Sequence, residues 1–128
     1  MESLEKKWLI YGAYGYTGKL ILENALKNGL VPIIAGRNER KLKELSKKFN
    51  VSFRSFPLGD LKVIEDNLKS IKILLNTAGP FSKTSKSLVD ACLKTGTHYL
   101  DITGEVDVFE DIHSKGVEAK NKNVTLMP

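Results

Sequence analysis

Short apolar runs alternate with amphipathic stretches along the whole chain, and this alternation constrains the fold more than any other feature. Apolar runs stopped by Gly or a polar residue are typical of strands buried on both faces. The stretches between them place leucine and isoleucine at helical spacing. The expected strands are 8–11, 30–35, 51–58, 71–76, 97–102 and 124–127, and the expected helices are 16–28, 39–49, 61–68, 85–94 and 106–121, the last one interrupted at Gly116.

Strands that alternate with helices form parallel sheets, because each crossover returns the chain to the same edge. A chain of 128 residues is long enough for one core but not for two. We therefore expect one α/β domain over residues 1–128, with a doubly wound parallel six-stranded sheet. The expected strand order is 3-2-1-4-5-6.

The composition indicates in which compartment the protein works and which partners it lacks. Hydrophobic residues make up 41% of the chain and charged residues 27%, which is typical of a globular domain. No apolar run approaches the roughly 20 residues that span a bilayer, so no membrane partner is expected. The charged segment 1–7 is followed by no apolar signal region, and a single cysteine, Cys92, fits a reducing compartment. We expect a cytoplasmic protein without a metal site.

A glycine-rich loop follows the first expected strand and has the spacing G-x-x-G-x-x-G. Between a strand and a helix, this motif is typical of dinucleotide binding in the Rossmann fold. Gly12 permits a tight turn, Gly15 lets a pyrophosphate approach the backbone, and Gly18 lets the helix pack on the sheet. Free N–H groups at the helix start stabilise phosphate, and the Thr17 hydroxyl adds a donor. The expected cofactor-binding residues here are Gly12, Ala13, Tyr14, Gly15, Tyr16, Thr17 and Gly18.

The end of the second expected strand distinguishes NADP from NAD. An NAD site usually has an acidic residue here, whereas an NADP site has a cation for the 2′-phosphate. The chain has Arg37 followed by Asn38, and Arg37 can pair with a phosphate through two hydrogen bonds. Arg40 and Lys41 reinforce the positive field. We expect NADP, with NAD less favoured; the alternative for Arg37 is an ordinary surface arginine.

Two further segments follow strands three and four. Asp60 is placed to receive the adenine amino group, or to cap a helix, and the two roles are compatible. The small-residue turn after the fourth strand lets a ribose or nicotinamide pass close to the backbone, although a purely structural turn is the alternative. The residues of this turn are Asn76, Thr77, Ala78, Gly79 and Pro80.

These motifs resemble those of the saccharopine dehydrogenase-like oxidoreductases, in the branch that uses NADP. The resemblance extends from about residue 8 to the end of the chain and implies a cofactor role for the glycine loop, for Arg37 and for the turn at 76–80. The segment 95–105, Thr-Gly-Thr-His-Tyr-Leu-Asp-Ile-Thr-Gly-Glu, is the most discriminating. The matching segments are 12–18, 35–38, 76–81 and 95–105.

The chain departs from this family pattern in two ways. Tyr14 stands where the family usually has Thr or Ser, and we expect this to change only the loop surface. The family continues beyond the position of Pro128 into a substrate and dimerisation domain, so we expect this chain to be the cofactor-binding half of a larger oxidoreductase.

Candidates for proton transfer are few. None of the four tyrosines has a lysine four residues later, so the Tyr-x-x-x-Lys motif of short-chain dehydrogenases is missing. His98 is expected to bond to backbone, although it is also an acid/base candidate. Asp101 and Glu105, at the end of the fifth strand, face either a substrate or their own loop. Cys92 is expected to pack in the core and His113 to lie on the surface.

We conclude from the sequence that the chain is the NADP(H)-binding domain of a larger oxidoreductase. It would position the nicotinamide for hydride transfer to a small-molecule substrate, without catalysis by the fragment alone, and a homodimer is possible. One alternative is a non-enzymatic NADP sensor. The net charge of +5 and the basic stretch 37–48 allow weak nucleic-acid binding, but a solvated helix face is the simpler interpretation, and no specific nucleic acid is expected.

Overall fold

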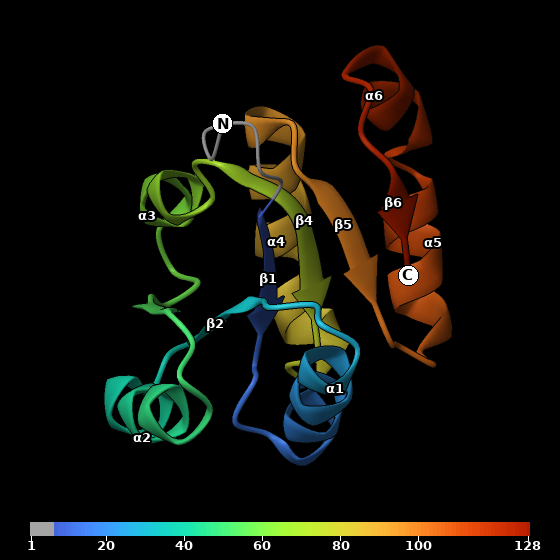
Figure 1. The fold of residues 1–128 in the computed structure, drawn as a ribbon. Coiled ribbons are helices and arrows are strands. Elements are labelled where there is room, and N and C mark those ends of the chain that lie inside the picture. Colours follow the sequence, from blue (N-terminus) through green and yellow to red (C-terminus); the bar gives the residue numbers. More distant parts are fainter. Residues whose placement is uncertain (1–6) are drawn as a thin grey trace.

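The computed structural model describes residues 7–128, so most of the charged segment at the N-terminus lies outside the described residues. Strands and helices alternate along this range (Figure 1). The elements are β1 (Lys7–Tyr11), α1 (Tyr16–Lys27), β2 (Ile33–Gly36), α2 (Glu39–Phe49), β3 (Phe53–Ser55), α3 (Leu61–Asn67), β4 (Ile71–Asn76), α4 (Phe81–Thr95), β5 (His98–Asp101), α5 (Val106–His113), α6 (Gly116–Asn121) and β6 (Leu126–Met127).

The strands form one sheet in the order β3-β2-β1-β4-β5-β6, and every pair of neighbours is parallel. This confirms the predicted doubly wound fold and its strand order. The chain moves outward from β1 through β2 to β3, and then returns to β4 on the other side of β1. At the carboxyl edge, Tyr11 of β1 lies between Ala35 of β2 and Asn76 of β4.

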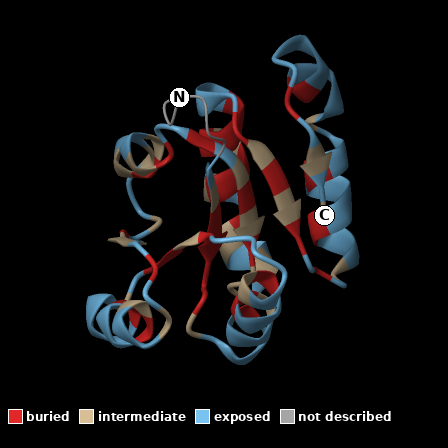
Figure 2. Cartoon of the chain, in the orientation of Figure 1, coloured by how far each residue is buried: buried red, intermediate tan, exposed pale blue. Residues whose placement is uncertain are grey.

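Both faces of the sheet are covered, because successive side chains of a strand point to opposite faces. Leu9 belongs to a core cluster that includes Leu88 of α4 and also draws residues from α3 and α5. Ile10 belongs to a second cluster that includes Leu22 of α1 and Leu42 of α2. Figure 1 shows α4 behind β1 and β4, and Figure 2 shows buried residues along the central strands.

Several element boundaries differ from the prediction, and β2 begins at Ile33, three residues later than expected. Strands β3 and β6 are shorter than the apolar pattern indicated, because both are edge strands with one neighbour. Helix α4 begins at Phe81, four residues earlier than expected, with Pro80 in the N-cap position. The stretch 106–121 contains two helices, and the second begins at Gly116, where the interruption was expected.

The helix caps follow the local chemistry of the sequence. The side chain of Asn38 accepts a hydrogen bond from the Lys41 N–H at the start of α2. Asp60 does the same for the Lys62 N–H at the start of α3. Both predicted N-caps are therefore confirmed.

Within residues 7–128, no helix is both long enough and apolar enough to cross a lipid bilayer. In the same range, no three His, Cys, Asp or Glu side chains come together in a way that could hold a metal ion.

Candidate cofactor site

A cleft of about 610 Å³ lies at the carboxyl ends of the strands, where the chain leaves β1 in one direction and β4 in the other. Doubly wound sheets bind ligands at this switch point. We call it the switch-point cleft. Its lining residues are Tyr11, Gly12, Tyr14, Gly15, Arg37, Pro57, Leu58, Gly59, Thr77, Ala78, Gly79, Pro80, Lys83 and Thr84.

The glycine loop is packed tightly between α1 and the end of β4. Gly12 has a φ of +88°, and a Cβ built on it would lie 2.9 Å from Cβ of Ala78. A Cβ on Gly18 would collide with the Gly12 carbonyl oxygen and would lie 2.9 Å from Oγ1 of Thr77. The predicted roles of Gly12 in the turn and of Gly18 in close packing are both confirmed.

The start of α1 is left without a protein cap. Its N-cap residue, Gly15, has no side chain to bond the first-turn N–H groups, and the first turn has no acidic residue. Gly15 also lines the switch-point cleft. The first N–H groups of a helix have no partner within the helix, so a phosphate in the cleft would find free donors here.

The charge of the cleft suits an anion. Arg37 lines it from the end of β2, and Lys83 lines it from the first turn of α4. The lining includes no Asp or Glu. Lys83 was missed in the sequence because α4 was expected to begin later; the proline at position 80, a residue common at helix starts, was the available signal.

The turn after β4 is fixed from beneath by Asn76, which is completely buried. Its Nδ2 donates to Oγ1 of Thr84 at 3.0 Å and to the hydroxyl of Tyr99 at 3.1 Å, and its Oδ1 accepts from the Ala78 N–H at 3.0 Å. Asn76 therefore shapes the turn without reaching the cleft.

Thr77 joins this turn to β1 and the glycine loop. Its Oγ1 lies 2.9 Å from the Tyr11 carbonyl oxygen and 3.1 Å from that of Gly12, and both are acceptors for its hydroxyl proton. Its backbone N–H also donates to the Tyr11 carbonyl. These bonds hold the turn after β4 against the end of β1 and the glycine loop.

The carboxylates near the end of β5 are occupied by protein donors. Asp101 is buried; it accepts a 2.6 Å hydrogen bond from the Tyr99 hydroxyl and a second bond from the Thr103 N–H. Burial, together with this bond to Asp101, raises the pKa of Tyr99 far above its ordinary value. Glu105 accepts from the Phe81 N–H at 3.1 Å and so caps α4. Neither carboxylate lines the switch-point cleft.

The two histidines and the cysteine have structural surroundings. Nδ1 of His98 accepts from the Thr125 N–H at 2.9 Å, which confirms the expected bond to backbone. Cys92 is fully buried in the core, and His113 is exposed in the last turn of α5.

The structure divides the predicted cofactor residues into two groups. Those that line the switch-point cleft are Gly12, Tyr14, Gly15, Arg37, Thr77, Ala78, Gly79 and Pro80. Those that do not line it are Ala13, Tyr16, Thr17, Gly18, Asn38, Asp60 and Asn76. The adenine contact of Asp60 stays a prediction; its neighbours Leu58 and Gly59 form that part of the wall.

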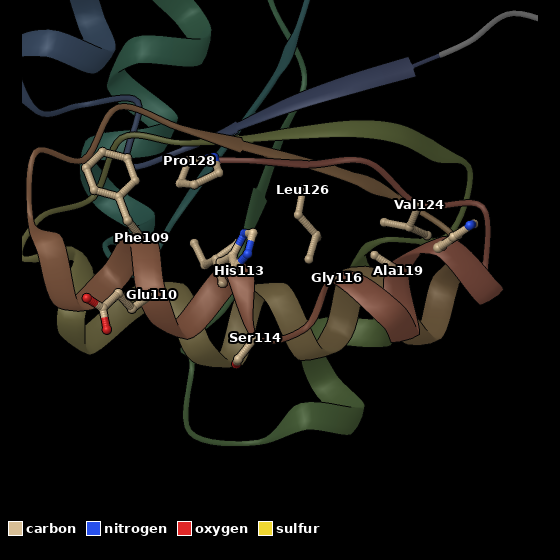
Figure 3. Close-up of a pocket in the computed structure, with 11 residues that line it drawn as sticks. Phe109, Glu110, His113, Ser114, Gly116, Ala119, Val124, Leu126 and Pro128 are labelled. Atoms are coloured by element: carbon tan, nitrogen blue, oxygen red, sulfur yellow. The ribbon is translucent and has the colours of Figure 1, made fainter.

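A larger hollow of about 770 Å³ lies between α5, α6 and β6 (Figure 3). Its walls include Phe109, Ile112, Val124 and Leu126. It lies at the edge of the sheet, with β5 and β4 between it and β1. It contains neither the glycine loop nor Arg37, so it does not compete with the switch-point cleft as the cofactor site.

The uncapped start of α1 and the two basic residues of the cleft, Arg37 and Lys83, indicate a site for a phosphate-bearing ligand. The comparison with protein families then decides which family the chain belongs to. Residues 8–127 match the family model of the saccharopine dehydrogenase NADP binding domain. The chain belongs to this family. The predicted resemblance is confirmed, and so is NADP as the cofactor. The residues present fit NADP, because Arg37 stands where an NAD site would carry an acid.

Curated relatives include reductases that are much longer than this chain. It is 30% identical over 128 residues to the trans-acting enoyl reductase of Mycobacterium leprae, covering 92% of this chain and 31% of the relative. A lipid droplet localized protein of Caenorhabditis elegans is 25% identical, with 91% and 30% covered. The chain thus spans less than a third of the length of these relatives.

Solved structures share the fold at low sequence identity. Saccharopine dehydrogenase of Saccharomyces cerevisiae superposes with a TM-score of 0.77 at 16% identity, covering 96% of this chain and 26% of that one. A complex of leucoanthocyanidin reductase from Vitis vinifera with NADPH gives 0.70 at 17%, covering 94% and 47%. At these identities the likeness shows the Rossmann-type fold and nothing finer.

Proposed function

We propose that this domain holds NADP(H) for hydride transfer to a small-molecule substrate in a longer reductase, and that the 128-residue chain alone binds the cofactor without turnover. The observation that carries the proposal is the switch-point cleft, which combines an uncapped helix start, Arg37 and Lys83 with no carboxylate. Such a lining suits a ligand that carries several phosphate charges.

Each part of the cleft has a separate task in this proposal. The glycine loop and the start of α1 bind the pyrophosphate, and Arg37 binds the 2′-phosphate. The turn at 77–80 positions the nicotinamide, whose ring supplies the hydride chemistry. Asp101 and Glu105 are held by Tyr99 and by backbone N–H groups, so no free carboxylate is available in the cleft for proton transfer.

The relatives support a reductase and not a specific substrate. Those named enoyl reductases suggest a conjugated carbon–carbon double bond as the hydride acceptor. Substrate and dimerisation surfaces would belong to the part of the relatives that this chain does not match. We place the protein in the cytoplasm, because its single cysteine is buried and free.

The first prediction tests the cofactor site. The protein is titrated with NADPH and with NADH, followed by nicotinamide fluorescence, and the titration is repeated with Arg37→Ala. We expect wild type to prefer NADPH. We expect the variant to lose about tenfold to about a hundredfold in NADPH affinity, because hydrogen bonds between charged groups contribute about 1.5–3 kcal/mol.

The control is Lys94→Ala, which removes the same charge from the last turn of α4, at the opposite edge of the sheet. It should leave both affinities unchanged. Equal affinity of the wild type for NADPH and NADH, or an Arg37→Ala variant whose NADPH affinity equals that of the wild type, would contradict the proposal. So would steady NADPH oxidation by the isolated chain with an enoyl or carbonyl substrate.

A non-enzymatic NADP sensor is the second candidate, favoured by the lack of a carboxylate or a histidine among the residues that line the cleft. It requires a partner protein whose affinity for this domain differs between NADP⁺ and NADPH. Binding measured with each form of the cofactor separates the two: equal partner affinity excludes the sensor.

A further inference from the structure

Tyr14 reaches from the glycine loop to the turn between β2 and α2. Its hydroxyl oxygen accepts hydrogen bonds from the backbone N–H groups of Arg37 and Asn38, each at 3.2 Å. Its ring lies on Gly36, where an added Cβ would be 2.5 Å from Cε2 of the ring. The expectation that a tyrosine here changes only the loop surface is therefore wrong. A serine or threonine hydroxyl, one bond beyond Cβ, would be too short for this contact.

The two backbone bonds determine what the Tyr14 hydroxyl can still do. A phenol oxygen has two acceptor sites and one proton. The N–H groups of Arg37 and Asn38 use the acceptor sites, and the hydrogen bonds found among residues 7–128 include none that Tyr14 donates. The proton is therefore left for a ligand or for water.

The surroundings of this hydroxyl are positively charged. Tyr14 and Arg37 line the switch-point cleft together. Tyr14 also borders a smaller hollow, whose lining has three lysines, Lys19, Lys41 and Lys48, and one carboxylate, Glu44. The Nζ of Lys41 lies 5.5 Å from the centre of the Tyr14 ring. An anion beside the phenol would meet a hydrogen-bond donor within a cationic field.

We propose that Tyr14 determines cofactor specificity by donating its hydroxyl proton to the 2′-phosphate of NADP(H), beside Arg37. The inference rests on the proposed placement of the cofactor in the switch-point cleft. A phosphate dianion accepts a stronger hydrogen bond than the neutral 2′-hydroxyl of NAD(H). The bond therefore stabilises bound NADP(H) more than bound NAD(H).

The packing of the ring argues that Tyr14 remains in place when the cofactor binds. The contact with Gly36 and the two backbone bonds hold the phenol in one position. The opposing model has the phenol oxygen occupy the place of a phosphate oxygen, so that it must leave when NADP binds. The two models predict changes of opposite sign when the hydroxyl is removed.

The second prediction is made for Tyr14→Phe, which deletes the hydroxyl and keeps the ring. Dissociation constants are measured for NADPH and NADH, and for the fragments 2′,5′-ADP and 5′-AMP. We expect affinity for NADPH and 2′,5′-ADP to fall about tenfold or more, and affinity for NADH and 5′-AMP to change less than about twofold. NADH and 5′-AMP serve as controls for the fold of the variant. Unchanged or tighter NADPH binding would overturn the proposal.

A spectroscopic measurement on the wild type keeps the test decisive if the variant folds poorly. Adding 2′,5′-ADP should shift the ultraviolet absorption of tyrosine, and 5′-AMP should not; absence of the shift would overturn the proposal. If the wild type binds neither NADPH nor NADH, the placement of the cofactor itself is wrong. If it prefers NADPH and Tyr14→Phe shows that preference undiminished, only the role of Tyr14 is wrong.

Discussion

Gly18 lies in the first turn of α1, where intrinsic helix propensity would favour alanine by about 1 kcal/mol. Its surroundings reverse this preference. A Cβ would collide with the Gly12 carbonyl and would lie 2.9 Å from Cα of Ala13 and from Oγ1 of Thr77. These neighbours are backbone and a hydrogen-bonded side chain, so they cannot move aside without disturbing the glycine loop.

The third prediction follows for Gly18→Ala. We expect it to lower the free energy of unfolding by about 1–3 kcal/mol, as overpacking does, and to weaken NADPH binding. Denaturant unfolding and NADPH titration are the measurements. Gly104→Ala is the matched control, because a Cβ there meets nothing within 4 Å. A Gly18→Ala variant more stable than wild type would show that propensity decides at this position.

The sequence predicts a residue of the cleft lining correctly only where the course of the backbone alone fixes its position. Gly12 and Arg37 were found because the ends of β1 and β2 fix their positions. Asn76 was predicted as a cofactor residue, but its direction depends on Thr84 and Tyr99, which are distant in the sequence. Tyr14 reaches the backbone of 37 and 38, a contact that no local pattern encodes.

The turn after β4 depends on a partner strand, because Asn76 is supported by Tyr99 of β5. The fourth prediction is made for Tyr99→Phe, which leaves Asn76 and the buried Asp101 without this hydroxyl. The free energy of unfolding should fall by about 1–3 kcal/mol. The loosened turn should weaken NADPH and NADH binding by the same factor, because the proposed 2′-phosphate site is at Arg37 and not at this turn.

Denaturant unfolding of Tyr99→Phe, and its titration with NADPH and with NADH, are the measurements for this prediction. Tyr16→Phe is the stability control, since Tyr16 is 83% exposed. A selective loss of NADPH binding in Tyr99→Phe would contradict the assignment of the turn to the nicotinamide end.

The basic residues of helix α2 have two different surroundings in the structure. Its basic residues were expected to be a solvated face, with nucleic-acid binding as the alternative. Nη1 of Arg40 lies 3.9 Å from Oε2 of Glu44, and Nζ of Lys43 lies 3.4 Å from Oε2 of Glu39. All four side chains are well exposed. Pairs of this kind contribute little to stability and serve mainly to solvate the helix. Lys41 differs, because it lies over the Tyr14 ring.

At the scale of the whole molecule, three buried groups with raised pKa values make the folded state lose stability at alkaline pH. Burial raises the pKa of Tyr11 from 10.0 to about 12, and burial also raises the pKa values of Cys92 and Tyr99. Each group keeps its proton in the folded state at a pH at which the unfolded chain has lost it. Their contribution to stability is therefore complete below the unfolded pKa and is lost as the pH rises toward the folded pKa.

The fifth prediction concerns this pH dependence. The free energy of unfolding should be steady near neutral pH, begin to fall near the unfolded Cys92 pKa of 9.0, and fall further from pH 10.0 to about 12 as Tyr11 contributes. Urea unfolding across this range is the measurement. Cys92→Ala should remove the earliest part of the decline. A flat profile to pH 12 would contradict the burial of these groups.

The fold was predictable from the sequence because the alternation of strands and helices persists over the whole chain, and parallel crossovers have one hand. The strand order follows from that pattern and the position of the glycine loop. Edge strands β3 and β6 were predicted less well, because pairing on one side leaves their ends undefined. The start of α4 was missed because residues 81–84 have no apolar periodicity.

The hydroxyl of Thr77 contacts the Gly12 carbonyl across 65 positions of the sequence. The two walls of the cleft thus come from separate halves of the chain, and only the folded domain brings them together. A ligand that recognises only the assembled form is linked to the global folding equilibrium. Bound NADP(H) would then lower the population of the unfolded chain and slow its proteolysis. The cofactor would stabilise the fold as well as take part in the reaction.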